Sequence, residues 1–102
     1  MEMILTGKTL SAREAYEFGL ANRVCPVEGF LAEAQRLAAE VAARAPVAVR
    51  MAREALRYGV ETTVRDGMEI ERRNFYLLFD TEDQKEGMHA FIEKRKPEYK
   101  GK

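Results

Sequence analysis

Residues 30–42 read FLAEAQRLAAEVA, and this stretch decides the fold class. Its apolar residues recur every three or four positions, which places them along one side of an α-helix. They are Phe30, Leu31, Ala34, Leu37, Ala38, Val41 and Ala42. The stretch therefore predicts a long amphipathic helix as the centre of a helical chain.

Two more helices are expected directly after this one. Pro46 suits the first position of a helix, and Gly59 is expected to end that helix. Thr63, with Asp66 three residues later, has the pattern of a capping box. It should open a further helix that stops at Asp80. The apolar residues of both segments again lie at helical spacing, so each helix should have one apolar face.

The last 22 residues, TEDQKEGMHAFIEKRKPEYKGK, predict one more helix and a basic tail. Thr81 is a good N-cap, and Glu82 and Asp83 suit the positive end of the helix dipole. Pro97 is expected to end this helix. Residues 94–102 contain five basic residues and one acidic residue, so they carry a local excess of positive charge.

The N-terminal part has weaker signals. Ser11 and Glu14 form a capping box for a short helix that should end at Gly19. Residues 22–27, NRVCPV, are the one short stretch with extended character, since Pro26 biases Cys25 towards extended backbone. Residues 1–7, MEMILTG, look like the last turns of a helix, which suggests a chain that is part of something longer. The whole sequence predicts a mainly α fold, a small bundle of about five helices with at most one short extended segment.

Composition limits the classes of function. The 102 residues contain 17 Lys and Arg and 17 Asp and Glu, so the whole chain is not built to search for nucleic acid or membrane by charge. The single cysteine, Cys25, cannot form an intrachain disulfide, which favours a reducing compartment such as a bacterial cytoplasm or an organellar matrix. No apolar run approaches the roughly 18 to 20 residues of a membrane span.

Catalytic and metal motifs are not found in the sequence. Cys25 and His89 fit a small core thiol and a helix-surface histidine better than a nucleophile and its base. Glu82, Asp83 and Glu86 could hold a divalent cation weakly, but a solvated helix face explains them better. We therefore predict no catalytic residue and no metal site in these residues. Glu69 is expected to pair with Arg73 four positions later.

Three residues remain as binding candidates. Phe75 opens an aromatic cluster, FYLLF, at residues 75–79. Phe91 and Lys94 are one helical turn apart and should share a face. An aromatic ring beside an ammonium group can stack on a nucleobase while the cation pairs with a phosphate.

Three stretches of the sequence carry a family resemblance: MEMILTGKTLSAREAYEFGLANRVCP, ARAPVAVRMAREAL and FDTEDQKEGMHAFIEKRKPEYKGK. In these stretches the chain resembles the enoyl-CoA hydratase/isomerase enzymes of the crotonase superfamily, and the resemblance covers residues 1–102. It implies that the chain is one α-helical C-terminal domain, which packs the oligomer and covers the acyl-CoA site. The family's N-terminal ββα-spiral core, with its oxyanion hole and two catalytic glutamates, is expected to precede Met1 and to be absent here.

The resemblance also assigns the binding candidates. Phe91 and Lys94 match positions that approach the CoA adenine and its 3′-phosphate from a neighbouring subunit, and Phe75 matches a position lining the acyl or pantetheine region. Acyl-CoA is then a substrate, and no resident cofactor is expected. The expected partners are acyl-CoA and further copies of the chain, as trimer or hexamer, with no nucleic acid and no membrane.

Two functions from different classes follow. The first is the C-terminal segment of an enzyme that hydrates trans-2-enoyl-CoA in fatty-acid β-oxidation, inactive alone. The alternative is a stand-alone helical module for self-association or protein interaction. Weak nucleic-acid binding through the basic tail ranks lower, because the rest of the chain is acidic. The carboxylates that decide between hydratase and isomerase activity in the family are expected outside this chain.

Overall fold

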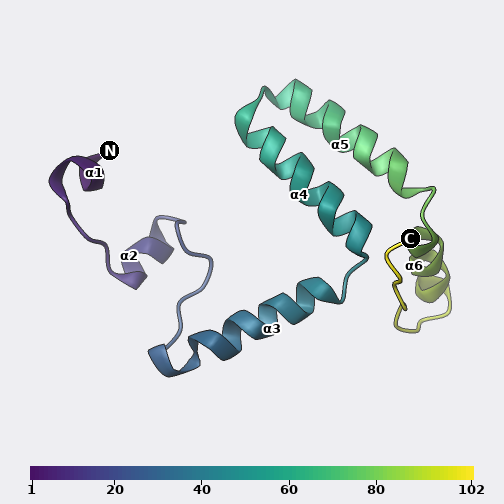
Figure 1. Ribbon diagram of the computed structural model, residues 1–102, viewed down its shortest axis with the longest axis horizontal. Coiled ribbons are helices and arrows are strands. Elements are labelled where there is room, and N and C mark those ends of the chain that lie inside the picture. Colours follow the sequence, from purple (N-terminus) through teal and green to yellow (C-terminus); the bar gives the residue numbers. More distant parts are fainter. The chain divides into compact units, whose positions relative to one another are not determined.

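The computed structural model describes all residues from 1 to 102, and its regular elements are all helical (Figure 1). They are α1 (Glu2–Thr6), α2 (Ala12–Glu17), the 3₁₀ turn η1 (Val27–Gly29), α3 (Phe30–Ala42), α4 (Pro46–Glu61), α5 (Val64–Leu78) and α6 (Glu82–Ile92). The mainly α prediction is confirmed. The segment expected to be extended, residues 22–27, forms no strand and leads into η1.

The chain divides into two compact units, residues 1–36 and residues 37–102. Helix α3, the element predicted from the opening stretch, begins in the first unit and ends in the second. Each unit has its own short-range hydrogen bonds and contacts. The expectation of one domain over residues 1–102 stays a prediction.

The first unit is held by local polar contacts. The Ser11 hydroxyl accepts a hydrogen bond from the Glu14 N–H at 3.2 Å, and the Glu14 carboxylate accepts one from the Ser11 N–H at 2.8 Å. This is the predicted capping box. The hydrogen bonds that the Glu14 carboxylate accepts from the Ser11 N–H and from the Ser11 hydroxyl lower the pKa of Glu14. Gly19 follows the helix with a φ of 74°, the left-handed backbone that glycine adopts without strain.

The second unit is organised by the hairpin of α4 and α5. The two helices approach closely at Gly59 and Gly67, where a Cβ added to Gly67 would lie 3.1 Å from the Gly59 Cα. Asn74 is buried, and its side-chain amide donates a hydrogen bond to the Met51 carbonyl at 3.1 Å. Two contacts therefore hold α4 against α5: a close approach of their backbones near the turn, and a side-chain hydrogen bond further along the helices.

Two predictions about this hairpin are wrong. Gly59 does not end α4, because its φ is not positive and the helix continues to Glu61. Glu69 pairs with Arg72 instead of Arg73, and Arg73 reaches across to Glu54 on α4 at 3.5 Å. Arg73 thus forms an ion pair between α5 and α4, where sequence spacing alone would favour an i,i+4 pair within α5.

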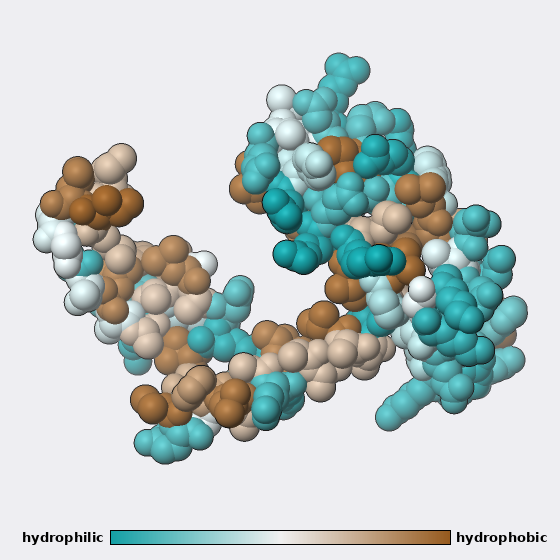
Figure 2. Space-filling model, in the orientation of Figure 1, coloured by the Kyte–Doolittle hydropathy of each residue, from teal (hydrophilic) through white to brown (hydrophobic).

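Most of the apolar side chains are not covered. Ala90 is the only hydrophobic residue that is buried, while large side chains such as Leu56 and Phe91 are mostly exposed. Figure 2 shows hydrophobic residues, in brown, at the surface over several helices. The predicted apolar faces exist, but these 102 residues do not bury them against one another. No helix has the length and apolar character needed to cross a membrane.

Candidate functional site

The end of α6 is a tight left-handed turn. The helix ends at Ile92, and Lys94 has a φ of 54°, the one positive φ among the non-glycine residues. The Arg95 N–H donates to the Ala90 carbonyl at 3.0 Å, and the Lys94 N–H donates to the Phe91 carbonyl at 3.3 Å. This pair of bonds is the Schellman motif, which usually has glycine at the left-handed position. The prediction that the helix runs to Pro97 is wrong, because this turn stops it earlier.

The turn changes the relation between Phe91 and Lys94. The two residues do not share a helical face, since Lys94 lies beyond the helix. They are instead joined through the hydrogen bond between their backbones. The Phe91 side chain is 83% exposed, and the ammonium group of Lys94 has no hydrogen bond or ion pair. An exposed aromatic ring and an unpaired ammonium group therefore come from two residues that are three positions apart in the chain.

The residues after Lys94 return along α6. We call residues 95–102 the tail strap (Figure 1). Asp83 accepts hydrogen bonds from the backbone N–H groups of Lys100 at 2.6 Å and Gly101 at 2.8 Å. The Asp83 N–H in turn donates to the Lys102 carbonyl at 3.2 Å. The sequence predicted Asp83 on a solvated helix face as a partner of the helix dipole. The solvated part of that prediction is wrong, because the strap buries Asp83, and this contact was missed.

Glu86 ties the strap to α6 nearer to Lys94. Its carboxylate binds the Arg95 guanidinium through both oxygens, at 2.5 and 2.9 Å, and also accepts the Glu98 N–H at 2.8 Å. The hydrogen bonds from Arg95, followed by the one from Glu98, lower the pKa of Glu86 to about 2. A pair of acidic residues three positions apart, followed by a basic tail, is the only sequence signal that could have suggested this clasp.

Phe75 lies in a different hollow of the same unit. Its ring packs edge-to-face on Phe79, with ring centroids 5.1 Å apart. It also lines a mostly apolar groove of about 620 Å³ between α4 and α5. Phe91 lines a second hollow of about 390 Å³ together with Tyr99. Ala48 and Leu78 line both hollows, so the two adjoin.

No group of carboxylates, His and Cys is arranged to hold a metal ion in residues 1–102. Three carboxylates have shifted pKa values, and all three are lowered. They are Glu14, Glu33 and Glu86. Glu33 accepts hydrogen bonds from Arg36 and Arg23, and these lower its pKa to about 2. Each of the three is thus held as an ionised acceptor by its partners, the opposite of a carboxyl prepared to donate a proton near neutral pH.

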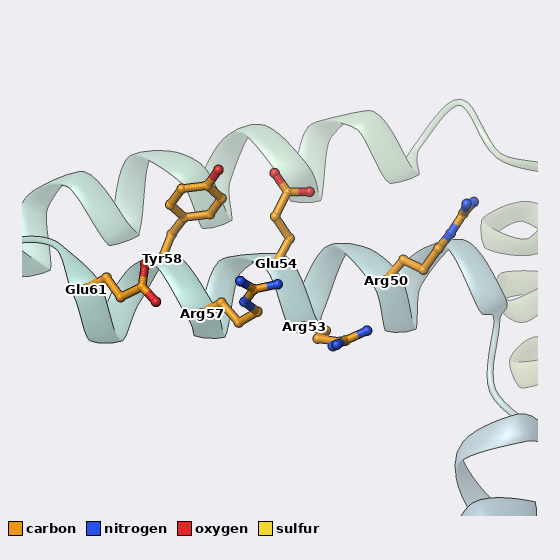
Figure 3. A pocket seen from close by; sticks show the side chains of 6 residues that line it. All are labelled: Arg50, Arg53, Glu54, Arg57, Tyr58 and Glu61. Atoms are coloured by element: carbon orange, nitrogen blue, oxygen red, sulfur yellow. The ribbon is translucent and has the colours of Figure 1, made fainter.

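A charged depression lies along α4 and shares no lining residue with the two apolar hollows. Its volume is about 400 Å³, and it is lined by Arg50, Arg53, Glu54, Arg57, Tyr58 and Glu61 (Figure 3). All six side chains come from the one helix, and Glu54 and Tyr58 extend towards α5. Both signs of charge line it, and every residue in it is exposed. It resembles a solvated helix face more than a built site.

Comparisons with known proteins identify the family. The sequence profile described as "Enoyl-CoA hydratase/isomerase" matches residues 1–102. The mitochondrial enoyl-CoA hydratase of Pongo abelii is 42% identical over 100 residues, which are 98% of this chain and 34% of that protein. The 2,3-dehydroadipyl-CoA hydratase of Escherichia coli K12 is 39% identical over 101 residues, 99% of this chain and 40% of that protein.

A solved structure gives the same result for the fold. The enoyl-CoA hydratase of Bacillus anthracis superimposes with a TM-score of 0.94 at 40% identity, covering 99% of this chain and 39% of that chain. The helices described above therefore match the helical part of the crotonase fold. The chain spans well under half the length of the relatives it matches. On these matches, the chain belongs to the enoyl-CoA hydratase/isomerase family.

Proposed function

We propose that these 102 residues form the CoA-covering and oligomer-packing part of an enzyme that hydrates trans-2-enoyl-CoA, and that they do not catalyse hydration alone. The observation that carries the proposal is the family match over the full chain, together with a superposition that covers 39% of a hydratase. The remaining part of such an enzyme would supply the chemistry.

The requirements of hydration support the second half of the proposal. Adding water across the double bond needs donors for a developing enolate oxygen and carboxyl groups that move protons. The shifted carboxylates of this chain already have fixed partners, such as Arg95 for Glu86. No residue of the chain is assigned a catalytic role.

Phe91 and Lys94 are the proposed contacts to CoA. The exposed Phe91 ring can stack on the adenine, and the unpaired Lys94 ammonium can pair with the 3′-phosphate. Phe75 is proposed to line the acyl or pantetheine region from its apolar groove. Acyl-CoA is the substrate in this proposal, with no resident cofactor.

The uncovered apolar surface supports an assembled enzyme. Phe75, Met68 and Leu56 line the groove between α4 and α5, and all three are more than half exposed. Contiguous apolar surface of this kind marks an interface in a water-exposed protein. We propose that the complete enzyme is a homo-oligomer, a trimer or hexamer, located in a bacterial cytoplasm or a mitochondrial matrix.

A chimera tests the function. The matched segment of the Bacillus anthracis enoyl-CoA hydratase is replaced by these 102 residues, and hydration of crotonyl-CoA is followed by the loss of enoyl absorbance. The isolated chain should show no turnover above the uncatalysed rate, and the chimera should be active. Turnover by the isolated chain, or an inactive but folded chimera, would refute the proposal.

The exposed groove also favours a second candidate, a stand-alone module that self-associates through α4 and α5. Sedimentation over a range of concentrations separates the two. A module predicts an oligomer of the isolated chain together with a chimera that fails to assemble, whereas the enzyme segment predicts that the chimera assembles like its parent.

A further inference from the structure

We propose that Asp83 is a positioning residue for Lys94: it clasps the tail strap onto α6 and so holds the backbone from which the Lys94 ammonium reaches an anionic group of the substrate. The inference rests on the proposed function, since it concerns the cation assigned there to CoA. It concerns a different residue, however, at the opposite end of α6, and it has its own structural readout.

Asp83 has the features of a built contact. Its side chain is only 3% exposed, although it is an ionisable residue on a short helix. Each of its two oxygens accepts a backbone N–H, from Lys100 and from Gly101. Hydrogen bonds to a carboxylate are stronger than those between neutral groups, and a buried charge requires such partners. The strap is therefore a folded part of this unit.

The strap also fits its surroundings by shape. The Tyr99 hydroxyl lies 3.4 Å from the position that a Cβ on Gly87 would take, so the ring covers that glycine. Gly101 has a φ of 75°, and a Cβ on it would lie 3.4 Å from the Pro46 ring at the start of α4. A glycine is required here for its backbone, and the strap thereby reaches the hairpin.

Lys94 sits where α6 turns into the strap. Its left-handed backbone is costly for a residue with a side chain, so the turn needs support from both sides. The helix side supplies the two Schellman hydrogen bonds. The strap side supplies Arg95 and Glu98, both bound to Glu86, and then the contacts to Asp83. Asp83 binds the far end of the strap, so both ends of the strap are fixed to α6.

A fixed turn would matter for recognition of a phosphate. Lysine is a long side chain with several rotatable bonds, and ordering it costs free energy on binding. With its backbone held, Lys94 loses less freedom when its ammonium pairs with an anion. Loosening the strap should therefore weaken the part of CoA affinity that comes from the 3′-phosphate, and leave the rest unchanged.

The test uses Asp83→Asn, which keeps the shape of the side chain. It replaces one of the two acceptor oxygens with an NH₂ group, which would face the backbone N–H of Lys100 or Gly101 and cannot accept its hydrogen bond. Glu82→Gln is the matched control, because the neighbouring Glu82 is exposed and has no hydrogen bond or ion pair in the structure. Gly101→Val is a second variant that disturbs the strap from its other side without changing a charge. Amide hydrogen exchange on the full chain should show the Lys100 and Gly101 N–H groups exchanging at least about tenfold faster in Asp83→Asn and Gly101→Val, and unchanged in Glu82→Gln.

The second readout is made in the active chimera. Asp83→Asn should raise KM for crotonyl-CoA several-fold, with kcat unchanged and with KM for crotonyl-dephospho-CoA unchanged. Lys94→Ala serves as the reference for complete loss of the phosphate contact.

Three outcomes would count against these claims. If amide exchange is unaltered in both strap variants, the clasp does not exist and the inference is overturned. If Asp83→Asn frees the strap but only Lys94→Ala changes the ratio of KM for crotonyl-CoA to KM for crotonyl-dephospho-CoA, the positioning role is overturned while the CoA contact stands. If Lys94→Ala does not change the ratio, the proposed phosphate contact itself fails.

Discussion

Glu86 binds both terminal nitrogens of Arg95, nine residues further along the chain, and this ion pair bridges α6 and the strap that follows it. Arg95 also donates to Glu93 at 2.6 Å. Although α6 ends five residues before Pro97, this ion pair holds the residues that follow the helix against it. A capped helix with a free basic tail would have left Lys94 on an unconstrained segment.

The first prediction concerns pH. The pKa of Glu86 is lowered from 4.5 to about 2, so the stability it contributes is fully present above 4.5 and is lost as pH falls through about 2. The Glu98 N–H, which donates to Glu86, should report protonation of this carboxylate as a change of its amide chemical shift centred near pH 2. Glu86→Gln should abolish this titration. A Glu98 amide that titrates unchanged in the variant would contradict the assignment.

The second prediction concerns the buried amide in the hairpin. Asn74→Asp replaces the donor to the Met51 carbonyl with a carboxylate, which leaves two acceptors facing each other in a buried site. It should lower the free energy of unfolding by about 1–3 kcal/mol near neutral pH, and by less in acid, where the carboxyl can donate. Urea unfolding followed by circular dichroism measures both values. A loss that does not depend on pH would argue against the hydrogen bond as its cause.

The third prediction uses the two glycines of the hairpin as a matched pair. Gly67→Val should destabilise by about 1–3 kcal/mol, because its side chain would push against the backbone of Gly59. Gly59→Ala should stabilise by about 0.5–1 kcal/mol, since a Cβ there meets no atom within 4 Å and alanine favours the helix. Thermal unfolding of the two variants distinguishes them. Equal shifts in Tm would show that the close approach does not constrain the hairpin.

The fourth prediction separates the ring from the cation. Phe91→Ala in the chimera should raise KM for crotonyl-CoA and for crotonyl-dephospho-CoA by the same factor, because both carry the adenine that the ring is proposed to stack on. The removal of one stacking partner corresponds to about 1–3 kcal/mol. Phe91→Tyr keeps an aromatic face and serves as the control. A loss confined to the phosphorylated substrate would assign the effect to Lys94.

Much of the fold could be predicted because its signals are local. The Phe30–Ala42 helix begins and ends where the apolar period does, and the caps at Ser11, Thr63 and Thr81 are all present in the structure. These features depend on residues three or four positions apart. Gly59 shows the limit, since a glycine ends a helix only where the backbone turns left-handed.

The site was predicted less completely because its contacts are not local. Phe91 and Lys94 were selected by spacing, but a shared helical face was the wrong reason, since the left-handed turn at Lys94 ends the helix between them. Asp83 looked like a first-turn residue complementing the dipole. Only the folded strap, 17 and 18 residues later, shows what it binds. No pattern in the sequence fixes where a tail of this kind returns.

The central claim, that Lys94 contacts the 3′-phosphate of CoA in a complete hydratase, has one direct test. KM for crotonyl-CoA and for crotonyl-dephospho-CoA is measured in the chimera, with Lys94 and with Lys94→Ala. Removing one charge-assisted contact should raise KM for crotonyl-CoA by roughly tenfold to a hundredfold, corresponding to about 1.5–3 kcal/mol, and leave KM for the dephospho substrate unchanged. An equal change for both substrates, or no change for either, would contradict it.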